Sequence, residues 1–211
     1  MKGDVINIKP EYLRTAAEII NLCGPRYFDQ NRILLIAGES GSGKSVTAIS
    51  LQKELLKQGI DALVLHQDDY FHLPPASNHT AREEDAGRVG PGEVNLELLQ
   101  NHMDAFTKGD VRLTKPLVYY AENQIIQETI NMQPYQVLIV EGTYTMKLER
   151  ADLHIFMERN YLETLPNRIS RMRDVANDFV EQVLEIEHHI IAPMRKKAHI
   201  LIRKNYNAES L

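Results

Sequence analysis

A glycine- and serine-rich run has the residue types and spacing needed to hold a phosphate group. Residues 38–45 read GESGSGKS and match the pattern G-x-x-x-x-G-K-[ST] at every fixed position. Glycines let several backbone N–H groups turn inward toward one anion, and a helix that begins after them adds the positive end of its dipole. In this pattern Lys44 reaches the β- and γ-phosphates of a nucleotide, and the Ser45 hydroxyl binds Mg²⁺. The predicted nucleotide-binding residues are Gly38, Glu39, Ser40, Gly41, Ser42, Gly43, Lys44, Ser45 and Val46.

Two neighbouring carboxylates, Asp68 and Asp69, follow the apolar segment at residues 62–66. In an open parallel sheet, ligands bind beyond the carboxyl ends of the strands, so these side chains can face a transferred phosphate there. We predict that Asp68 accepts the proton of an acceptor hydroxyl, as the catalytic aspartate of kinases does. A solvated acidic turn is the competing interpretation, and a shared role for Asp69 stays open.

A third carboxylate, Glu141, directly follows the apolar run at residues 137–140. An acid at this point lies where proteins with a phosphate loop hold Mg²⁺ or its water shell, although the usual residue is Asp. Ser45 and Glu141 are therefore the predicted metal-binding residues. The alternative is a glutamate that ends a strand and faces solvent.

Three arginines, Arg168, Arg171 and Arg173, lie close together near the end of a predicted helix. Guanidinium groups bind phosphate oxygens two bonds at a time, and phosphoryl transfer places negative charge on those oxygens. We predict that this cluster acts on the transferring phosphoryl group. The competing interpretation is that these arginines only complement the dipole at a helix end.

These candidate residues need elements that bring them together, and the hydrophobic pattern predicts such elements. Short apolar runs, typical of buried strands, occupy residues 33–37, 62–66, 137–140, 153–157 and 199–203. Helices are predicted at residues 10–23, 45–58, 96–106, 162–173 and 179–191, the first with an apolar stripe at Leu13, Ala16, Ala17 and Ile20. Strands that alternate with helices, and are apolar throughout, indicate an α/β fold whose parallel sheet is covered on both faces.

Two further segments are harder to place by pattern. Residues 71–93 show no periodicity and predict a long loop, which in a compact domain is usually functional or disordered. We place the acceptor there, with Tyr70, Arg82 and Arg88 as candidate contacts. Residues 111–132 are rich in Val, Tyr and Thr and suggest a hairpin.

Composition limits the function classes. The 211 residues suit one domain, 1–211, with a helical extension at residues 1–30. The net charge of −5 disfavours nucleic acid as a partner, and the single cysteine excludes an intrachain disulfide. There is neither an apolar run of membrane-spanning length nor a signal-like start, so we expect a cytoplasmic protein with no membrane partner. Homo-oligomerisation stays open, and His188 and His189 are expected on the surface.

The chain resembles the uridine kinase / phosphoribulokinase family of P-loop kinases. Four stretches in family order carry the resemblance: GESGSGKS at 38–45, HQDDYF at 66–71, VLIVEGTY at 137–144 and IIAPMRKKAHILI at 190–202. The resemblance implies a three-layer P-loop kinase fold with a five-stranded, mainly parallel sheet, flanking helices, a lid near residues 168–180 and a small β-hairpin. It also implies ATP and Mg²⁺ as cofactors, Asp68 as the base, Glu141 as the magnesium-associated acid, and Arg168 and Arg173 in the lid.

The resemblance is weaker on the acceptor side. Gly90 and Gly92 stand where uridine kinases carry a histidine and an aspartate that help to hold the nucleoside. We therefore predict an ATP- and Mg²⁺-dependent kinase for a hydroxyl of a small, nucleoside-like or related metabolite, with uridine a poor acceptor. Two alternatives stay open: a nucleotide-binding regulatory protein without transfer activity, and a P-loop ATPase stimulated by a partner.

Overall fold

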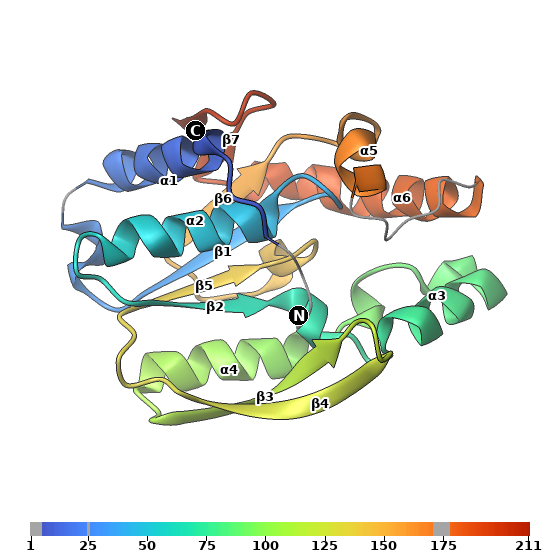
Figure 1. Ribbon diagram of the computed structural model, residues 1–211, viewed down its shortest axis with the longest axis horizontal. Helices are drawn as coiled ribbons and strands as arrows, with labels where there is room; N and C mark the ends of the chain where they lie inside the picture. The colour runs from blue at the N-terminus through green and yellow to red at the C-terminus, as the bar shows by residue number, and fades with distance from the viewer. Residues whose placement is uncertain (1–5, 25, 171–177) are drawn as a thin grey trace.

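The computed structural model describes residues 6–24, 26–170 and 178–211 of the chain. Its centre is a six-stranded sheet in the order β2-β5-β1-β6-β7-β8 (Figure 1). The strands are β1 (Arg32–Gly38), β2 (Ala62–His66), β5 (Val137–Glu141), β6 (Leu153–Met157), β7 (Ile200–Ile202) and β8 (Ala208–Ser210). The first five run parallel, which confirms the predicted sheet, and β8 adds an antiparallel edge.

The sheet is buried on both faces, which is why its strands are continuously apolar. In β1, Ile33, Leu35 and Ala37 point into one core, and Leu34 and Ile36 point into the other. Helices α1 (Pro10–Cys23) and α2 (Lys44–Leu56) cover one face (Figure 1). Helix α4 (Leu96–Lys108) and the end of α6 (Asp178–Ile191) pack against the other. The predicted three-layer arrangement is therefore confirmed.

Helix α1 has its predicted bounds, and two of the four residues of its predicted stripe, Ala16 and Ile20, are buried. Leu13 and Ala17 are only partly buried, whereas the fully buried positions are Tyr12, Thr15, Ala16, Ile19 and Ile20. Two polar residues belong to this face because they bond to Tyr206: the Thr15 hydroxyl donates to its carbonyl oxygen, and the Tyr12 and Tyr206 hydroxyls lie 3.1 Å apart. A pattern based on apolar residues alone places the face too far around the helix.

The loop predicted for residues 71–93 is corrected by the structure. Helix α3 (Pro75–Glu84) occupies its middle, and short 3₁₀ turns follow at Ala86–Arg88 and Pro91–Glu93. Proline at the first position suits a helix start. No residue of α3 is buried, so its sequence has no need of an apolar stripe and gives no helical periodicity.

The predicted hairpin is present as β3 (Arg112–Tyr119) and β4 (Gln124–Asn131), which form a separate antiparallel sheet beside α4 (Figure 1). Its connecting loop contacts α3, where the Ala76 N–H donates to Asn123 Oδ1 over 2.8 Å. Helix α5 (Tyr161–Ser170) opens the predicted lid, of which residues 171–177 lie outside the described part of the chain. Among the described helices, none is long and apolar enough to span a bilayer.

Candidate active site

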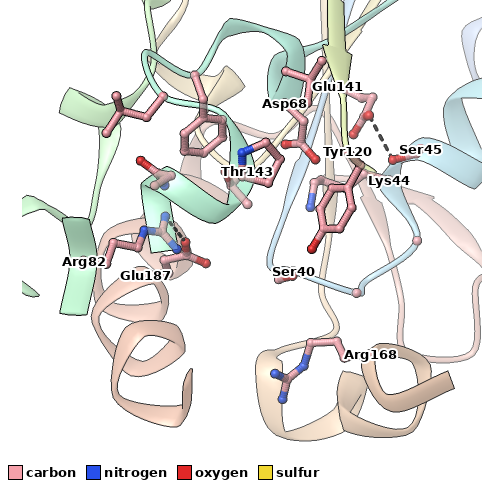
Figure 2. A pocket seen from close by; sticks show the side chains of 17 residues that line it. Ser40, Lys44, Ser45, Asp68, Arg82, Tyr120, Glu141, Thr143, Arg168 and Glu187 are labelled. Atoms are coloured by element: carbon pink, nitrogen blue, oxygen red, sulfur yellow. Dashed lines mark hydrogen bonds and ion pairs between the residues drawn. The ribbon is translucent and has the colours of Figure 1, made fainter. Parts of the chain in front are cut away.

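A cavity of about 270 Å³ opens at the carboxyl ends of β1, β2 and β5. The phosphate loop, the residues that follow β2 and β5, the hairpin, α3, α5 and α6 all contribute side chains to its wall (Figure 2). The parallel register of the strands explains this meeting, because His66 of β2 and Ile36 of β1 are both paired with Glu141 of β5. The switch point of an open α/β sheet is where such a site is expected.

The phosphate loop takes the tight conformation that its glycines permit. Gly41 and Gly43 have φ values of 74° and 105°, in the left-handed region that side chains rarely adopt. A Cβ atom at Gly41 would lie 2.7 Å from Arg168 Cγ, and one at Gly43 would lie 2.9 Å from Tyr12 Cε1. Glycine is thus required at both positions for the loop to fit beneath α5 and α1.

The nine predicted nucleotide-binding residues divide into two groups. Those that line the cavity are Ser40, Gly41, Gly43, Lys44 and Ser45. The other four support the loop from behind: Glu39 and Ser42 are buried polar residues, Val46 packs in the core, and Gly38 lies against Met157. Helix α2 begins at Lys44, so the N–H groups of its first turn lie directly behind the cavity-lining residues.

Glu39 joins the phosphate loop to two helices. One carboxylate oxygen accepts a 2.6 Å hydrogen bond from the Tyr161 N–H at the start of α5, and the other lies 2.6 Å from His188 Nδ1 on α6. His188 was expected at the surface, and its side chain is 34% exposed, but its ring also bonds to the phosphate loop through Glu39. His189 is exposed.

Asp68 and Glu141 line the cavity together, with opposite pKa shifts. Burial raises the pKa of Asp68, and the neighbouring Glu141 charge raises it further, while Lys44 opposes both. Burial also raises the pKa of Glu141, but the hydrogen bond and charge of His66 outweigh it and hold that pKa below its usual range. Glu141 therefore stays ionised in the presence of Asp68.

The residues predicted to bind a metal fit Mg²⁺. Ser45 Oγ donates to Glu141 Oε1 over 2.9 Å, and His66 Nδ1 lies 2.7 Å from the same oxygen. Mg²⁺ keeps several waters and needs only one or two protein oxygens beside the phosphates. A hydroxyl and an ionised carboxylate that already meet at the cavity wall supply those oxygens. In the described residues no group of three His, Cys, Asp or Glu side chains forms a closed metal site.

Asp69 points away from the cavity and has a structural environment. Its carboxylate accepts hydrogen bonds from Lys115 Nζ over 2.8 Å and from the Val118 N–H over 3.0 Å. Burial raises the pKa of Asp69, but the Lys115 charge dominates and lowers it. The neighbouring aspartates therefore differ in role: Asp68 faces the cavity, and Asp69 holds the hairpin.

Of the three candidate acceptor contacts, only Arg82 lines the cavity. Tyr70 is buried in the hydrophobic core, and its hydroxyl lies 2.8 Å from His102 Nδ1. Successive residues of a tight turn point in different directions, so proximity to Asp68 in sequence did not bring Tyr70 into the site. Arg88 is exposed and lies outside the cavity wall, because the turn at residues 86–88 carries it outward.

Arg168 is placed as predicted, on the cavity wall beside the phosphate loop (Figure 2). It is 5% exposed, and its Nη2 donates to the Tyr161 carbonyl oxygen over 3.2 Å. Thr164, one turn earlier on α5, donates to the Ser40 carbonyl oxygen over 2.8 Å and ties the helix to the loop. Arg171 and Arg173 lie outside the described residues, so the role assigned to Arg173 stays a prediction.

The structure adds residues to the cavity wall that sequence reasoning missed, above all Asn78 on α3, Tyr120 directly after β3, Thr143 and Glu187 on α6. For Glu187 a signal existed, because it lies in the buried stripe of α6 with Val183, Leu184 and Ile191. An acid on the apolar face of a helix requires a buried partner. No such signal marked Asn78, Tyr120 or Thr143 in the sequence.

The chain is similar to known proteins over most of its length. The profile of the Phosphoribulokinase / Uridine kinase family matches residues 33–206. A bifunctional alpha-galactosidase/sucrose kinase of Mediterraneibacter gnavus is 30% identical over 191 residues, 83% of this chain but only 20% of that protein. A uridine kinase of Salmonella paratyphi B is 28% identical over 186 residues, 81% of this chain and 85% of that protein.

Solved structures show the same fold. A structure described as a possible uridine kinase from Bacillus stearothermophilus superposes with a TM-score of 0.63 at 18% identity. The match covers 90% of this chain and 96% of that one.

Proposed function

This chain belongs to the Phosphoribulokinase / Uridine kinase family, and from that premise we propose that it transfers the γ-phosphoryl group of ATP to a hydroxyl of a small metabolite. One observation carries the proposal: the phosphate loop, the carboxyl group of Asp68 and the Ser45–Glu141 pair line a single cavity. Phosphoryl transfer is mostly a matter of positioning and of electrostatic stabilisation, and these groups supply both.

On the donor side, backbone N–H groups of the cavity-lining residues of the phosphate loop and the Lys44 ammonium bind the β- and γ-phosphates. Lys44 Nζ donates to the Glu39 carbonyl oxygen over 3.0 Å, which holds the ammonium at the rim of the loop. Ser45 and Glu141 hold Mg²⁺, directly or through water, and the ion neutralises charge on the phosphate oxygens when bound. His66 positions Glu141 from behind.

On the acceptor side, Asp68 orients the hydroxyl that attacks the γ-phosphorus. The new bond forms between the acceptor oxygen and phosphorus, the bond to the β,γ-bridging oxygen breaks, and ADP leaves. Asp68 takes the hydroxyl proton and later releases it to solvent. A base is most effective when its pKa lies near the working pH, and burial moves the pKa of Asp68 in that direction.

Arg168 completes the donor site, since it lies beside Gly41 on the cavity wall. We assign it to the negative charge that develops on the transferring phosphoryl group. Arg173 shares this assignment as a lid residue. Closure of the lid would exclude water, which otherwise competes with the acceptor for the phosphoryl group.

The acceptor class follows partly from the relatives. One is named as a sucrose kinase and one as a uridine kinase, and both names denote the phosphorylation of uncharged molecules rich in hydroxyl groups. We propose an acceptor of this general kind. The chain spans one fifth of the bifunctional relative, so the galactosidase part of that name has no bearing on these residues.

The test is ADP release at fixed ATP and Mg²⁺ with a panel of acceptors, in wild type and in Lys44→Ala. Loss of the Lys44 ammonium should lower the turnover number by about 100-fold or more, because a preorganised charge on the phosphates is removed. Lys57→Ala is the control, since Lys57 is exposed at the other end of α2 and pairs with Glu54. Near-wild-type turnover in Lys44→Ala would contradict the kinase proposal. ATP hydrolysis with no dependence on any acceptor would favour a P-loop ATPase.

A further inference from the structure

The acceptor side of the cavity contains a cation, Arg82, that faces the donor groups from the opposite wall. Arg82 extends from α3 and lies across the cavity from Lys44, Ser45 and Glu141 (Figure 2). An arginine here suggests at first an acceptor that carries a phosphate or a carboxylate, because guanidinium binds both in a bidentate manner. The surroundings of Arg82 contradict that interpretation.

The Arg82 guanidinium is already engaged by two carboxylates of the protein. Its Nε and Nη2 donate to the two oxygens of Glu93, over 2.6 and 2.9 Å, and Nη2 also donates to Glu187 Oε1 over 3.1 Å. The Glu93 side chain is only 3% exposed and that of Glu187 only 10%. This is a buried ion cluster with one positive and two acidic members.

Three of the five guanidinium N–H donors of Arg82 bond to these carboxylates, so an anionic acceptor that draws Arg82 toward itself weakens this cluster. Removing the partner of a buried charge leaves that charge uncompensated, which is strongly unfavourable. The incoming anion would also face Glu187 and Asp68, both on the cavity wall. In the described part of the cavity wall, Arg82 is the cation on the acceptor side, and its charge is already shared between Glu93 and Glu187.

The same wall suits hydroxyl groups. Glu187 and Asn78 line the cavity and present carboxyl and amide groups, and Asn78 Nδ2 is oriented by a 3.0 Å bond to Glu93 Oε1. Hydroxyls both donate and accept, so they match such a mixed set. Burial raises the pKa of Glu187 although Arg82 opposes it, and a carboxyl group bonds to hydroxyls in either protonation state. Phe71, Leu73 and Val118 add apolar surface for a carbon skeleton.

We propose that the acceptor is an uncharged carbohydrate, a sugar or a polyol, whose hydroxyl groups bind Glu187 and Asn78. Arg82 does not bind an acidic acceptor; it orients Glu187 and, through Glu93, Asn78. This inference rests on the proposed kinase function and specifies its acceptor.

The test compares acceptors that share a carbon skeleton and differ in charge. Suitable pairs are fructose with fructose 6-phosphate, glucose with gluconate, and glycerol with glycerate, with sucrose added as a larger neutral sugar. We expect the best neutral compound to exceed every anionic one in kcat/KM by about 100-fold or more, because buried like charges discriminate strongly. An anionic compound as the best acceptor overturns the inference and leaves the kinase function intact. Absence of turnover with every acceptor contradicts both.

A substitution tests whether Glu187 binds the acceptor and sets the preference for uncharged compounds. Glu187→Gln keeps the shape and removes a charge, so it should raise KM for the neutral acceptor about tenfold while KM for ATP stays constant. It should also narrow the preference for the neutral member of each pair. Glu185→Gln is the matched control, because Glu185 is exposed on the same helix. An unchanged charge preference in Glu187→Gln would overturn the assignment.

A second variant covers the case in which Glu187→Gln fails to fold. Asn78→Ala changes a helix with no buried residue, so folding is expected to persist. It should raise KM for the neutral acceptor without a change in KM for ATP. A uniform loss of kcat with both KM values constant would contradict the proposed contact.

Discussion

At the residue scale, Asp68 and Glu141 lie at neighbouring strand ends, and their surroundings shift their pKa values in opposite directions. Glu141 lies opposite His66 in the parallel register and bonds to both His66 and Ser45, which keeps it ionised. Asp68 lies two residues beyond the same histidine, where burial raises its pKa. Titratable groups whose environments push their pKa values apart indicate an acid–base assignment.

Substitutions separate the two roles. Asp68→Asn keeps the shape but removes the base, so kcat should fall by about 100-fold or more with little change in KM for ATP. Glu141→Gln should instead raise the Mg²⁺ concentration needed for half-maximal rate. The measurement is a Mg²⁺ titration of the initial rate for each variant. An identical change in rate and in Mg²⁺ requirement would show that the roles are wrongly assigned.

The pH profile gives an independent check on Asp68. A base must be ionised, so the rate should increase with pH as it passes through the pKa of Asp68. Because that pKa is raised, the acid limb should lie above the value of about 4 that is typical of an exposed aspartate. An acid limb with its midpoint at or below pH 4 in the pH profile of kcat would contradict the assignment of Asp68 as the base.

How far the site could be predicted also differs from residue to residue. Lys44, Ser45, Asp68 and Glu141 lie in local patterns at strand ends, and the geometry of a parallel sheet brings such ends together. Asn78 and Glu187 lie far apart in sequence, on helices that meet only through tertiary packing. No spacing in the sequence could have joined them, and the apolar stripe around Glu187 was the single available signal.

At the element scale, α6 connects the two halves of the cavity. Glu187 bonds to Arg82 on the acceptor wall, and the adjacent His188 bonds to Glu39 in the phosphate loop. Since Glu39 is 5% exposed, its carboxylate depends on this partner and on the Tyr161 N–H. The helix therefore bonds to the phosphate loop and to the opposite wall of the cavity.

Removal of this link should affect the donor side. His188→Ala leaves a buried carboxylate with one fewer hydrogen bond, at a cost of about 1–3 kcal/mol. For a chain of this length each kcal/mol corresponds to about 2–4 °C in Tm. We also expect a several-fold increase in KM for ATP. The control is His189→Ala, which changes an exposed neighbour. Equal effects of the two variants on Tm and KM would rule out the link.

The hairpin depends on a different buried contact. Lys115 on β3 is 3% exposed and pairs with both Asp69 and Glu128, and Asp69 also accepts from the Val118 N–H. The pKa of Asp69 is lowered, so its contribution to stability is present above the unfolded pKa of about 4 and is lost as the pH falls through the folded value.

Asp69→Asn should therefore lower the free energy of unfolding at pH 7. The variant should also lose less of this free energy than wild type does when the pH falls from 4 to 2. The magnitude at pH 7 should be about 3 kcal/mol, because Lys115 loses a buried partner. Urea unfolding at both ends of this range measures the effect. Asp110→Asn is the control, since Asp110 is exposed just before the hairpin. The same pH dependence in Asp69→Asn as in wild type would refute the contribution of Asp69.

At the scale of the whole molecule, the donor and acceptor halves of the site have different origins. The donor half follows from β1, β2 and β5, whose apolar runs predicted a parallel sheet. The acceptor half is formed by α3, the hairpin and α6, which lie around the sheet (Figure 1). No residue of α3 is fully buried and β8 is three residues long with two of them exposed, so neither has a hydrophobic pattern to detect. The fold can be predicted for elements whose burial requires apolar residues. The acceptor half of the cavity is formed largely by elements without that requirement.

This division leads to a prediction about uridine, the acceptor named for one relative. A site that reads a base discriminates by factors of up to about 10⁴, because its buried polar groups need partners. Gly90 and Gly92 have no side chain and do not line the cavity, and the Gly90 N–H already donates to Glu93 Oε2 over 2.8 Å. We expect kcat/KM for uridine and cytidine to lie about 100-fold or more below that of the best acceptor. Steady-state kinetics on both nucleosides beside the neutral sugars makes the comparison. If uridine is the best acceptor, the prediction is wrong, and the contacts to uridine come from other residues of the cavity wall.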